Sequence, residues 1–374
     1  MENKRERIHL LDILRGISLF GILLMNGVAM SAPLHFTNPF QFYSGLDDIL
    51  YDVSAIIING SFYPIFAFLF GCTFYIIYKN AVNKGQNGQL KLLKRVVILL
   101  LFGIIHSVFL FYGDILVDYA ICGLLLLLII RLRAKIQLII SIALLSINLM
   151  CTLLFSWLLS LTVENDIYTS MEDIESSTRS YDQGQFIDII QENINFFLTF
   201  RLLNIFTADL FGILPIMILG ILFIRHQLYK SQWLDKHLLW IIPILLGVGL
   251  AIKALPVITN GSLSSQLIAS FGGYLVAFGY IGLIMKLMKQ RFIQLFMKPF
   301  QYIGRFSLTT YITQSIALVI MYYSIGFGLY GDLGLTEIYP LLITIFVVQL
   351  IIVMVYRKFF KYGPLEWIWR KATG

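Results

Sequence analysis

The sequence predicts an all-α integral membrane protein, a bundle of about ten transmembrane helices with both termini in the cytoplasm. Three observations lead there. Of the 374 residues, 58% are hydrophobic and only 13% are charged. The apolar residues form long uninterrupted runs, and positive charge is concentrated in alternate connections between them; Arg179, Arg201 and Lys253 are the exceptions. Soluble domains carry about a quarter charged residues, so the composition excludes a water-soluble enzyme and a disordered chain.

The apolar runs recur along the whole chain and are long enough to cross a bilayer. They are continuous rather than alternating, which favours helices over barrel strands. Short connections join them, so we treat residues 1–374 as a single polytopic membrane domain. The predicted spans cover residues 8–30, 61–78, 94–112, 114–130, 136–161, 202–224, 237–256, 266–287, 301–325 and 336–356.

The connections fall into two sets of opposite charge, which predicts their sides of the membrane. By the positive-inside rule, the basic set and both termini face the cytoplasm, and we expect a bacterial plasma membrane. The net charge of +7 is therefore a topology signal, and no nucleic-acid partner is expected. Basic residues lie at 4–7, 79–95, 131–135, 225–236, 286–298 and 357–371; acidic residues lie at 47–52, in an outer acidic loop at 162–200, and at 332–337.

The first span carries polar residues at membrane depth, where each is a functional hypothesis by default. Asp12 and Arg15 are three residues apart and share a helix face. Asn26 returns to nearly the same side, roughly 16 Å further along. These three residues form a polar stripe along the helix. The stripe is consistent with ligand binding and equally with a structural Asp12–Arg15 pair.

The third and fourth spans form a hairpin that brings a histidine near carboxylates. The turn is predicted at Tyr112 and Gly113. His106 precedes this turn and Asp118 follows it by about the same number of residues, so His106 and Asp118 lie at similar depth. Asp114 lies at the mouth of the hairpin. Histidine beside a carboxylate suits proton transfer near neutral pH. An intramembrane histidine can also serve only as a helix-to-helix hydrogen bond.

Other polar residues are weaker candidates. Arg201, at the outer start of the sixth span, is a candidate anion contact, or a salt bridge to the acidic loop. Tyr311 and Gln314 share one face of the ninth span with Ser307 and either line a cavity or join helices. His35, in the first outer loop, is a second candidate base. Zinc-helix, Walker, nucleophile-elbow and dinucleotide motifs are absent, so no metal site is predicted.

Through these and neighbouring residues, the chain resembles the YeiB-like membrane protein family, domain of unknown function 418. The likeness extends over almost the whole chain in family order. Its most specific blocks are GDIL-x-x-YA, beginning at Gly113, and GPLEWIWR, beginning at Gly363. The other matching segments are RIHLLDILRGISLFGILLMN at 7–26, SFYPIFAFLFG at 61–71, LLKRVVILLLFGIIHSVFLFYGDILVDYA at 92–120 and GRFSLTTYITQS at 304–315.

That family in turn resembles the wider transmembrane acyltransferases, through LD-x-x-RG in the first span and the aromatic YPIFAFLFG segment. Those enzymes take an acyl group from a cytoplasmic thioester and pass it to an acceptor on the far side. The resemblance implies an acyl-CoA-type donor that passes near Asp12 and Arg15. Several of them carry a catalytic histidine where this chain has Asn26, or in the following loop, where it has His35; His106 with Asp114 or Asp118 is the replacement we expect.

Three functions follow as expectations. The first is a membrane acyltransferase, with membrane lipid and a small-molecule or glycan acceptor as partners. The second is a proton-coupled transporter or exporter of a small anionic or lipid-like solute, for which broken helices are the expected hallmark; the sequence shows one convincing break, at 59–64. The third is a lipid-binding scaffold without catalysis.

Overall fold

A computed structural model describes residues 9–162, 171–201 and 210–373, with the side chains of 162, 200 and 201 left out. Within these ranges every regular element is a helix and no strand occurs. The all-α class is therefore confirmed for the described chain. The physical reason is that a bilayer offers no hydrogen-bond partners to the backbone, and a helix satisfies its own.

Seven described helical stretches are long and apolar enough to cross a membrane. Three shorter apolar helices overlap the predicted spans at 114–130, 202–224 and 301–325, of which residues 202–209 lie outside the described chain; their short length leaves the total of about ten a prediction. The seven stretches are α1 (His9–Ala29), α3 with α4 (Leu46–Ile57 and Phe62–Val82), α5 (Gly88–Phe109), α7 (Ala134–Thr162), α12 with α13 (Gln232–Lys253 and Leu255–Ile258), α14 (Leu263–Leu287) and α18 (Leu335–Tyr356), and the shorter ones are α6 (Leu116–Ile129), α11 (Leu214–Arg225) and α17 (Ser307–Tyr322).

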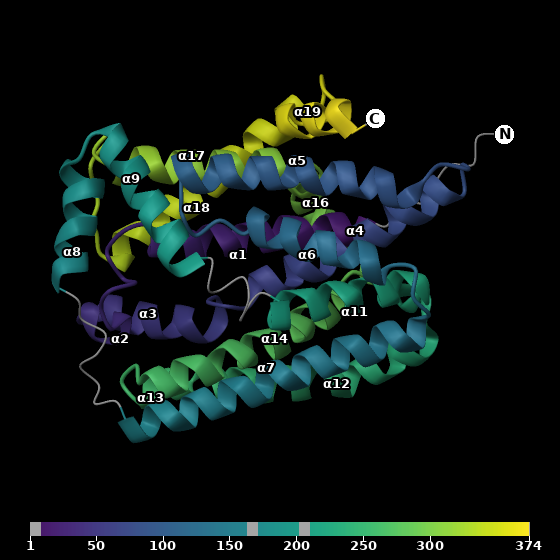
Figure 1. Cartoon of the computed structure of the whole chain (residues 1–374), viewed down its shortest axis with the longest axis horizontal. Coiled ribbons are helices and arrows are strands. Elements are labelled where there is room, and N and C mark those ends of the chain that lie inside the picture. Colours follow the sequence, from purple (N-terminus) through teal and green to yellow (C-terminus); the bar gives the residue numbers. More distant parts are fainter. Residues whose placement is uncertain (1–8, 163–170, 202–209, 374) are drawn as a thin grey trace.

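The remaining short elements gather at the two ends of the bundle. Figure 1 shows α3, α8, α9 and α13 at the left end, and the α4–α5 connection with α19 toward the right. We call these the acidic end and the basic end, after the carboxylates of α3, α8 and α9 and the Lys and Arg residues of 79–95 and 357–371. The short elements are α2 (Pro39–Phe42), α8 (Met171–Thr178), η2 (Arg179–Gln183), α9 (Phe186–Phe196), η3 (Phe197–Arg201), η5 (Leu228–Lys230), α15 (Arg291–Phe296), α16 (Lys298–Arg305) and α19 (Pro364–Thr373).

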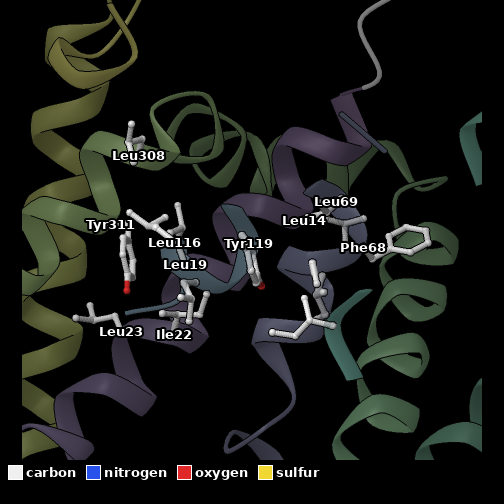
Figure 2. Packing of buried hydrophobic residues seen from close by; sticks show 14 of the residues in the cluster. Leu14, Leu19, Ile22, Leu23, Phe68, Leu69, Leu116, Tyr119, Leu308 and Tyr311 are labelled. Carbon is white, nitrogen blue, oxygen red and sulfur yellow. The ribbon is translucent and has the colours of Figure 1, made fainter. Parts of the chain in front are cut away.

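Helix α1 is the centre of the bundle. It contacts α4, α14, α16, α17 and α18, and most of its residues are buried. Its apolar side chains join the core of the molecule: Figure 2 shows Leu19 and Leu23 of α1 near Leu116 of α6 and Tyr311 of α17. Polar side chains on α1 are therefore surrounded by other helices, and those helices must supply their hydrogen-bond and ion-pair partners.

Two glycines let α1 and α16 approach to backbone contact. A Cβ at Gly304 would lie 1.8 Å from the carbonyl oxygen of Asp12, and one at Gly16 would lie 2.0 Å from that of Phe300. Lipid tails are as apolar as the helix surfaces, so the hydrophobic effect does not drive membrane helices together. They associate through close packing, which small residues at the crossings permit. The crossing places Arg305, the last residue of α16, against the polar part of α1.

Several predicted features of the two ends can be compared with the structure. Helix α3 carries Asp47 and Asp48 in its first turn, and Leu46, Ile49, Val53 and Ile57 expose their side chains along it. The acidic loop is largely helical where described. The expectation of a single helix break at 59–64 is wrong: the chain also breaks at Phe306, between α16 and α17, and at Ala254, between α12 and α13.

We predict that Gly304→Ala destabilises the protein by about 1–3 kcal/mol, because the added methyl group overlaps the α1 backbone and forces the crossing apart. Thermal unfolding in detergent, followed by tryptophan fluorescence, measures the effect. The matched control is Gly247→Ala in α12, where nothing lies within 4 Å of the added Cβ and no loss is expected. Equal melting temperatures for the two variants would contradict the close α1–α16 packing.

Candidate functional site

The α5–α6 hairpin positions the central groups of the site. Asp114 caps the first turn of α6, because its Oδ2 accepts a hydrogen bond of 2.8 Å from the backbone N–H of Val117. Gly103 of α5 faces this turn: a Cβ there would lie 2.7 Å from the nitrogen of Val117 and 3.0 Å from Oδ2 of Asp114. His106 lies three residues after Gly103, on the same face of α5. The cap and the glycine together bring Asp114 to His106.

His106 lies between a carboxylate and a hydroxyl, with none of its surface exposed. Its Nδ1 is 3.0 Å from Oδ1 of Asp114, an ion-pair distance, although the carboxylate is not aligned with the N–H direction. Its Nε2 is 2.7 Å from Oγ of Ser315 in α17. The order carboxylate, imidazole and hydroxyl is that of a Ser-His-Asp triad. We call these three residues the buried triad.

Tyr311 covers the buried triad on one side. Its ring stacks on the His106 ring, with centroids 4.9 Å apart and planes 30° apart. Its hydroxyl donates to Oδ1 of Asp114 at 3.4 Å. Tyr311 also lines the cavity that approaches from the basic end, so its ring lies between that cavity and His106.

This cavity has a volume of about 210 Å³ and is mostly apolar, with charged residues at its outer part. Ile115, Leu116 and Tyr311 are part of its lining, and Tyr311 stacks on His106 of the buried triad. Four arginines contribute to its lining and outnumber the two carboxylates. The lining charges are Asp12, Arg15, Arg95, Arg305, Glu366 and Arg370. An apolar chamber with a basic mouth fits an amphiphilic anion.

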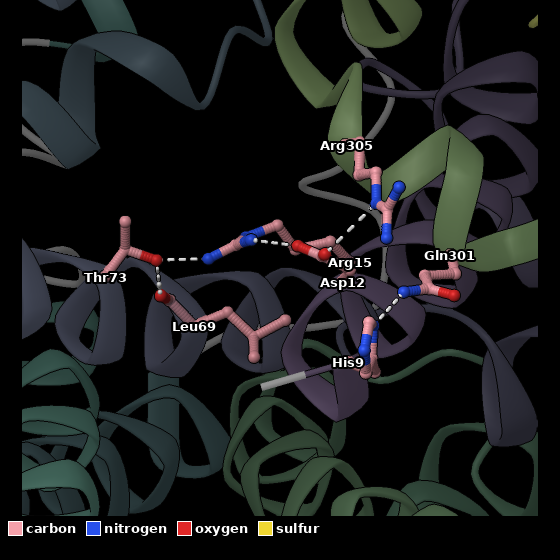
Figure 3. Close-up of polar contacts among 7 residues, drawn as sticks. All are labelled: His9, Asp12, Arg15, Leu69, Thr73, Gln301 and Arg305. Carbon is pink, nitrogen blue, oxygen red and sulfur yellow. Dashed lines mark hydrogen bonds and ion pairs between the residues drawn. The ribbon is translucent and has the colours of Figure 1, made fainter. Parts of the chain in front are cut away.

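Asp12 holds two of these arginines in place. Its Oδ1 is 3.1 Å from a guanidinium nitrogen of Arg15, and its Oδ2 is 3.5 Å from Nε of Arg305. Figure 3 shows Asp12 between the two guanidinium groups, with Arg15 reaching on to Thr73 of α4. The predicted Asp12–Arg15 pair is thus present, and it lines the cavity. The two guanidinium groups and the one carboxylate together carry one net positive charge, which favours an anionic ligand.

The C-terminal helix α19 completes the mouth. Glu366 accepts hydrogen bonds at 2.7 Å and 3.1 Å from the backbone N–H groups of Leu308 and Thr309, the free N-terminus of α17. This fixes α19 so that Trp369 lies 4.2 Å from the Arg95 guanidinium.

A second cavity, of about 510 Å³, opens beside the first. The two cavities share Thr73, Ile77, Arg95 and Arg370, and Lys84 and Lys91 line the second one. The GPLEWIWR block therefore builds the basic mouth.

At the acidic end, α9 packs against the last turn of α5, the turn that carries His106. Asn193 of α9 donates to the carbonyl oxygen of Val108, two residues after His106, at 3.1 Å. Tyr181 donates to Asn193 at 2.9 Å and stacks on Tyr323, which follows the end of α17. The acidic segment and the basic cavity thus lie on opposite sides of His106.

The structure separates the other predicted residues. Asp118 is buried in α6, but the carboxylate that contacts His106 is that of Asp114. Asn26 is buried in α1 and, among the described residues, is not part of the cavity lining. Gln314 donates to Gln349 of α18 at 3.0 Å, so it joins two helices. His35 pairs with Tyr112 at 2.9 Å. The side chain of Arg201 lies outside the described residues.

Two features could not be found from the sequence pattern used above: Ser315, and the gathering of Arg95, Arg305 and Arg370 around the cavity. Ser315 stands four residues after Tyr311 and therefore on its helix face, a signal that the TTYITQS segment contained. The gathering of Arg95, Arg305 and Arg370 gave no such signal, because they come from three helices far apart in the chain. Within the described ranges, no group of three or more His, Cys, Asp and Glu side chains could hold a metal ion.

Fold and site together define a polytopic helical membrane protein with a buried Ser-His-Asp arrangement beside a basic cavity. The family described as "Protein of unknown function (DUF418)" matches residues 223–374. The chain is 30% identical to the uncharacterized protein YxaH of Bacillus subtilis (strain 168), over 98% of this chain and 94% of that one. It is 23% identical to the uncharacterized protein YeiB of Escherichia coli (strain K12), over 98% and 96%.

The chain belongs to the DUF418 family, as its resemblance to YeiB-like proteins predicted. A third relative, an uncharacterized 39.9 kDa protein in the amylase 3' region of Bacillus acidopullulyticus, is 28% identical over 98% of this chain and 94% of its own. No solved structure matches the chain.

We predict that Asp114→Ala destabilises the fold more than Asp114→Asn. Alanine removes the cap of α6, worth about 1 kcal/mol, and leaves the buried His106 without its partner, which costs about 1–3 kcal/mol more. Asparagine keeps an acceptor for the Val117 N–H. Thermal unfolding in detergent measures both variants, with Asp332→Ala in an exposed loop as the control. An Asp114→Ala protein as stable as the control would contradict the capping role.

Proposed function

We propose that the protein is an acyltransferase of the cell membrane, which moves an acyl group from a cytoplasmic acyl-CoA-type thioester to an acceptor at the outer side. The observation that carries the proposal is the buried triad beside a cavity lined by four arginines, with Tyr311 in contact with both. A histidine oriented by a carboxylate is the general base of acyl transfer.

The cavity supports the donor half of this proposal. CoA carries phosphates on one end and a flexible thioester arm on the other. Arg95 and Arg370 line both the cavity and its wider mouth, and arginine forks suit phosphate. Arg15 lies deeper, held by Asp12, and the apolar lining beyond it leads to Tyr311. Phosphates at the mouth would direct the thioester arm toward His106.

The acceptor half rests on the opposite end. Hydroxyl or amine acceptors, including membrane lipids and glycans, would reach His106 from the acidic end, where α9 and Tyr181 cover it. Placing the basic end in the cytoplasm follows from the positive-inside rule. The resemblance of LD-x-x-RG to transmembrane acyltransferases supports the same direction of transfer.

We predict that protein in lipid nanodiscs cleaves acetyl-CoA or palmitoyl-CoA, and that His106→Ala slows this by about 10²-fold or more, the size of a lost general base. Release of free thiol, with water or a supplied glycan as acceptor, measures the rate. His226→Ala, an exposed histidine at the end of α11, is the matched control and should retain the wild-type rate. Wild-type and His106→Ala proteins that are equally inert toward every donor would refute the proposal.

A second candidate, proton-coupled transport of a small anionic or lipid-like solute, is favoured by a different observation. The helix break at Phe306 adjoins Arg305, which pairs with Asp12, and broken helices beside buried charge are typical of transporter sites. His106 and Asp114 would then relay protons. Solute flux in proteoliposomes that follows a pH gradient, without thioester cleavage, would favour transport over acyl transfer.

A further inference from the structure

The nitrogen that would act as the base already has a partner. Nε2 of His106 lies 2.7 Å from Oγ of Ser315, and Nδ1 faces Asp114. A general base removes a proton from a group within hydrogen-bond reach. In this geometry that group is the Ser315 hydroxyl, because it lies within hydrogen-bond reach of Nε2.

The surroundings of Ser315 fit an activated hydroxyl better than a helix-to-helix link. Its alternative partner, the carbonyl oxygen of Tyr311, is 3.4 Å away, so the shorter contact is the one to His106. Only 1% of Ser315 is exposed, and Asp114 is wholly buried. In a Ser-His-Asp triad the carboxylate stabilises the imidazolium that forms when the histidine takes the serine proton.

We propose that Ser315 is the nucleophile of the reaction and carries the acyl group as a covalent ester, an inference that rests on the proposed function. The Oγ attacks the thioester carbonyl carbon as its proton passes to Nε2 of His106. The C–S bond then breaks, and the sulfur leaves as a thiol with that proton. An acceptor hydroxyl or amine attacks the ester carbon, its proton passes to His106, and the C–O bond to Ser315 breaks as Oγ takes the proton back.

The route from the cavity to Ser315 passes Tyr311. Tyr311 lines the cavity and stacks on His106, while Ser315 lies one helical turn further along α17. A rotation of the Tyr311 ring would join the cavity to the hydroxyl. Tyr311 is thus a positioning residue, which controls access and supports the Asp114 carboxylate through its own hydroxyl.

Acyl labelling tests the covalent step. Nanodisc protein is mixed with [¹⁴C]acetyl-CoA without acceptor, quenched in acid and digested. We expect label on the peptide containing Ser315, released by alkaline hydroxylamine as an ester should be. Ser315→Ala should lose the label, and Ser315→Cys should retain it in a form that neutral hydroxylamine cleaves. Thr313→Ala, a hydroxyl loss on the same helix, is the control; Thr313 donates to the carbonyl oxygen of Thr309 at 2.8 Å.

Two outcomes separate this inference from the proposed function. If Ser315→Ala and Ser315→Cys fold and turn over acyl-CoA at the wild-type rate without label, transfer is direct and the covalent step is wrong, while the acyltransferase proposal stands. A small fluorophosphonate reacts with an activated serine and needs no acyl donor. If it phosphonylates Ser315 and the reaction requires His106, the nucleophile is supported even where acyl-CoA is inert. Inert acyl-CoA together with this labelling would refute only the thioester donor.

Discussion

The structure depends on the contact between His106 and Asp114. A carboxylate at membrane depth costs several kcal/mol unless it is paired, and here neither side chain exposes any surface. Everything around the pair serves to satisfy it. The Val117 N–H and the Tyr311 hydroxyl bind the carboxylate, Ser315 binds the far side of the ring, and Gly103 leaves room for the turn that presents Asp114.

The same rule organises the basic end. Asp12 is the one carboxylate between Arg15 and Arg305 in Figure 3, and the glycine contact between α1 and α16 brings them together. Glu366 neutralises the exposed N–H groups at the start of α17 and in doing so fixes α19. Helix breaks, glycine crossings and ion pairs are thus parts of one arrangement. Its outcome is a cavity that is basic at the mouth and apolar toward the triad.

Much of the fold could be predicted from composition and charge, and the site only in part. Continuous apolar runs predict helices because the bilayer leaves the backbone no alternative. The symmetry of the hairpin about its turn predicted His106 and Asp118 at similar depth, with Asp114 at the mouth. The structure instead pairs His106 with Asp114, because the turn that begins α6 holds that carboxylate toward α5. Ser315 and Arg305 could not be placed that way, since their positions depend on how α16 and α17 cross α1 and α5. The helix period puts Gln314 on the same face as Tyr311, yet Gln314 donates a hydrogen bond to Gln349 of α18. This contact depends on how α17 and α18 pack together.

The central claim is that the cavity delivers a thioester from the basic end to His106. A cryo-EM structure of the protein in nanodiscs with a non-cleavable acetyl-CoA analogue, the thioester sulfur replaced by a methylene group, tests this most directly. The account predicts phosphate density beside Arg95 and Arg370, with the acyl arm running past Arg15 to Tyr311. Density for the analogue at any other surface, or a cavity filled by lipid at saturating analogue, would contradict it.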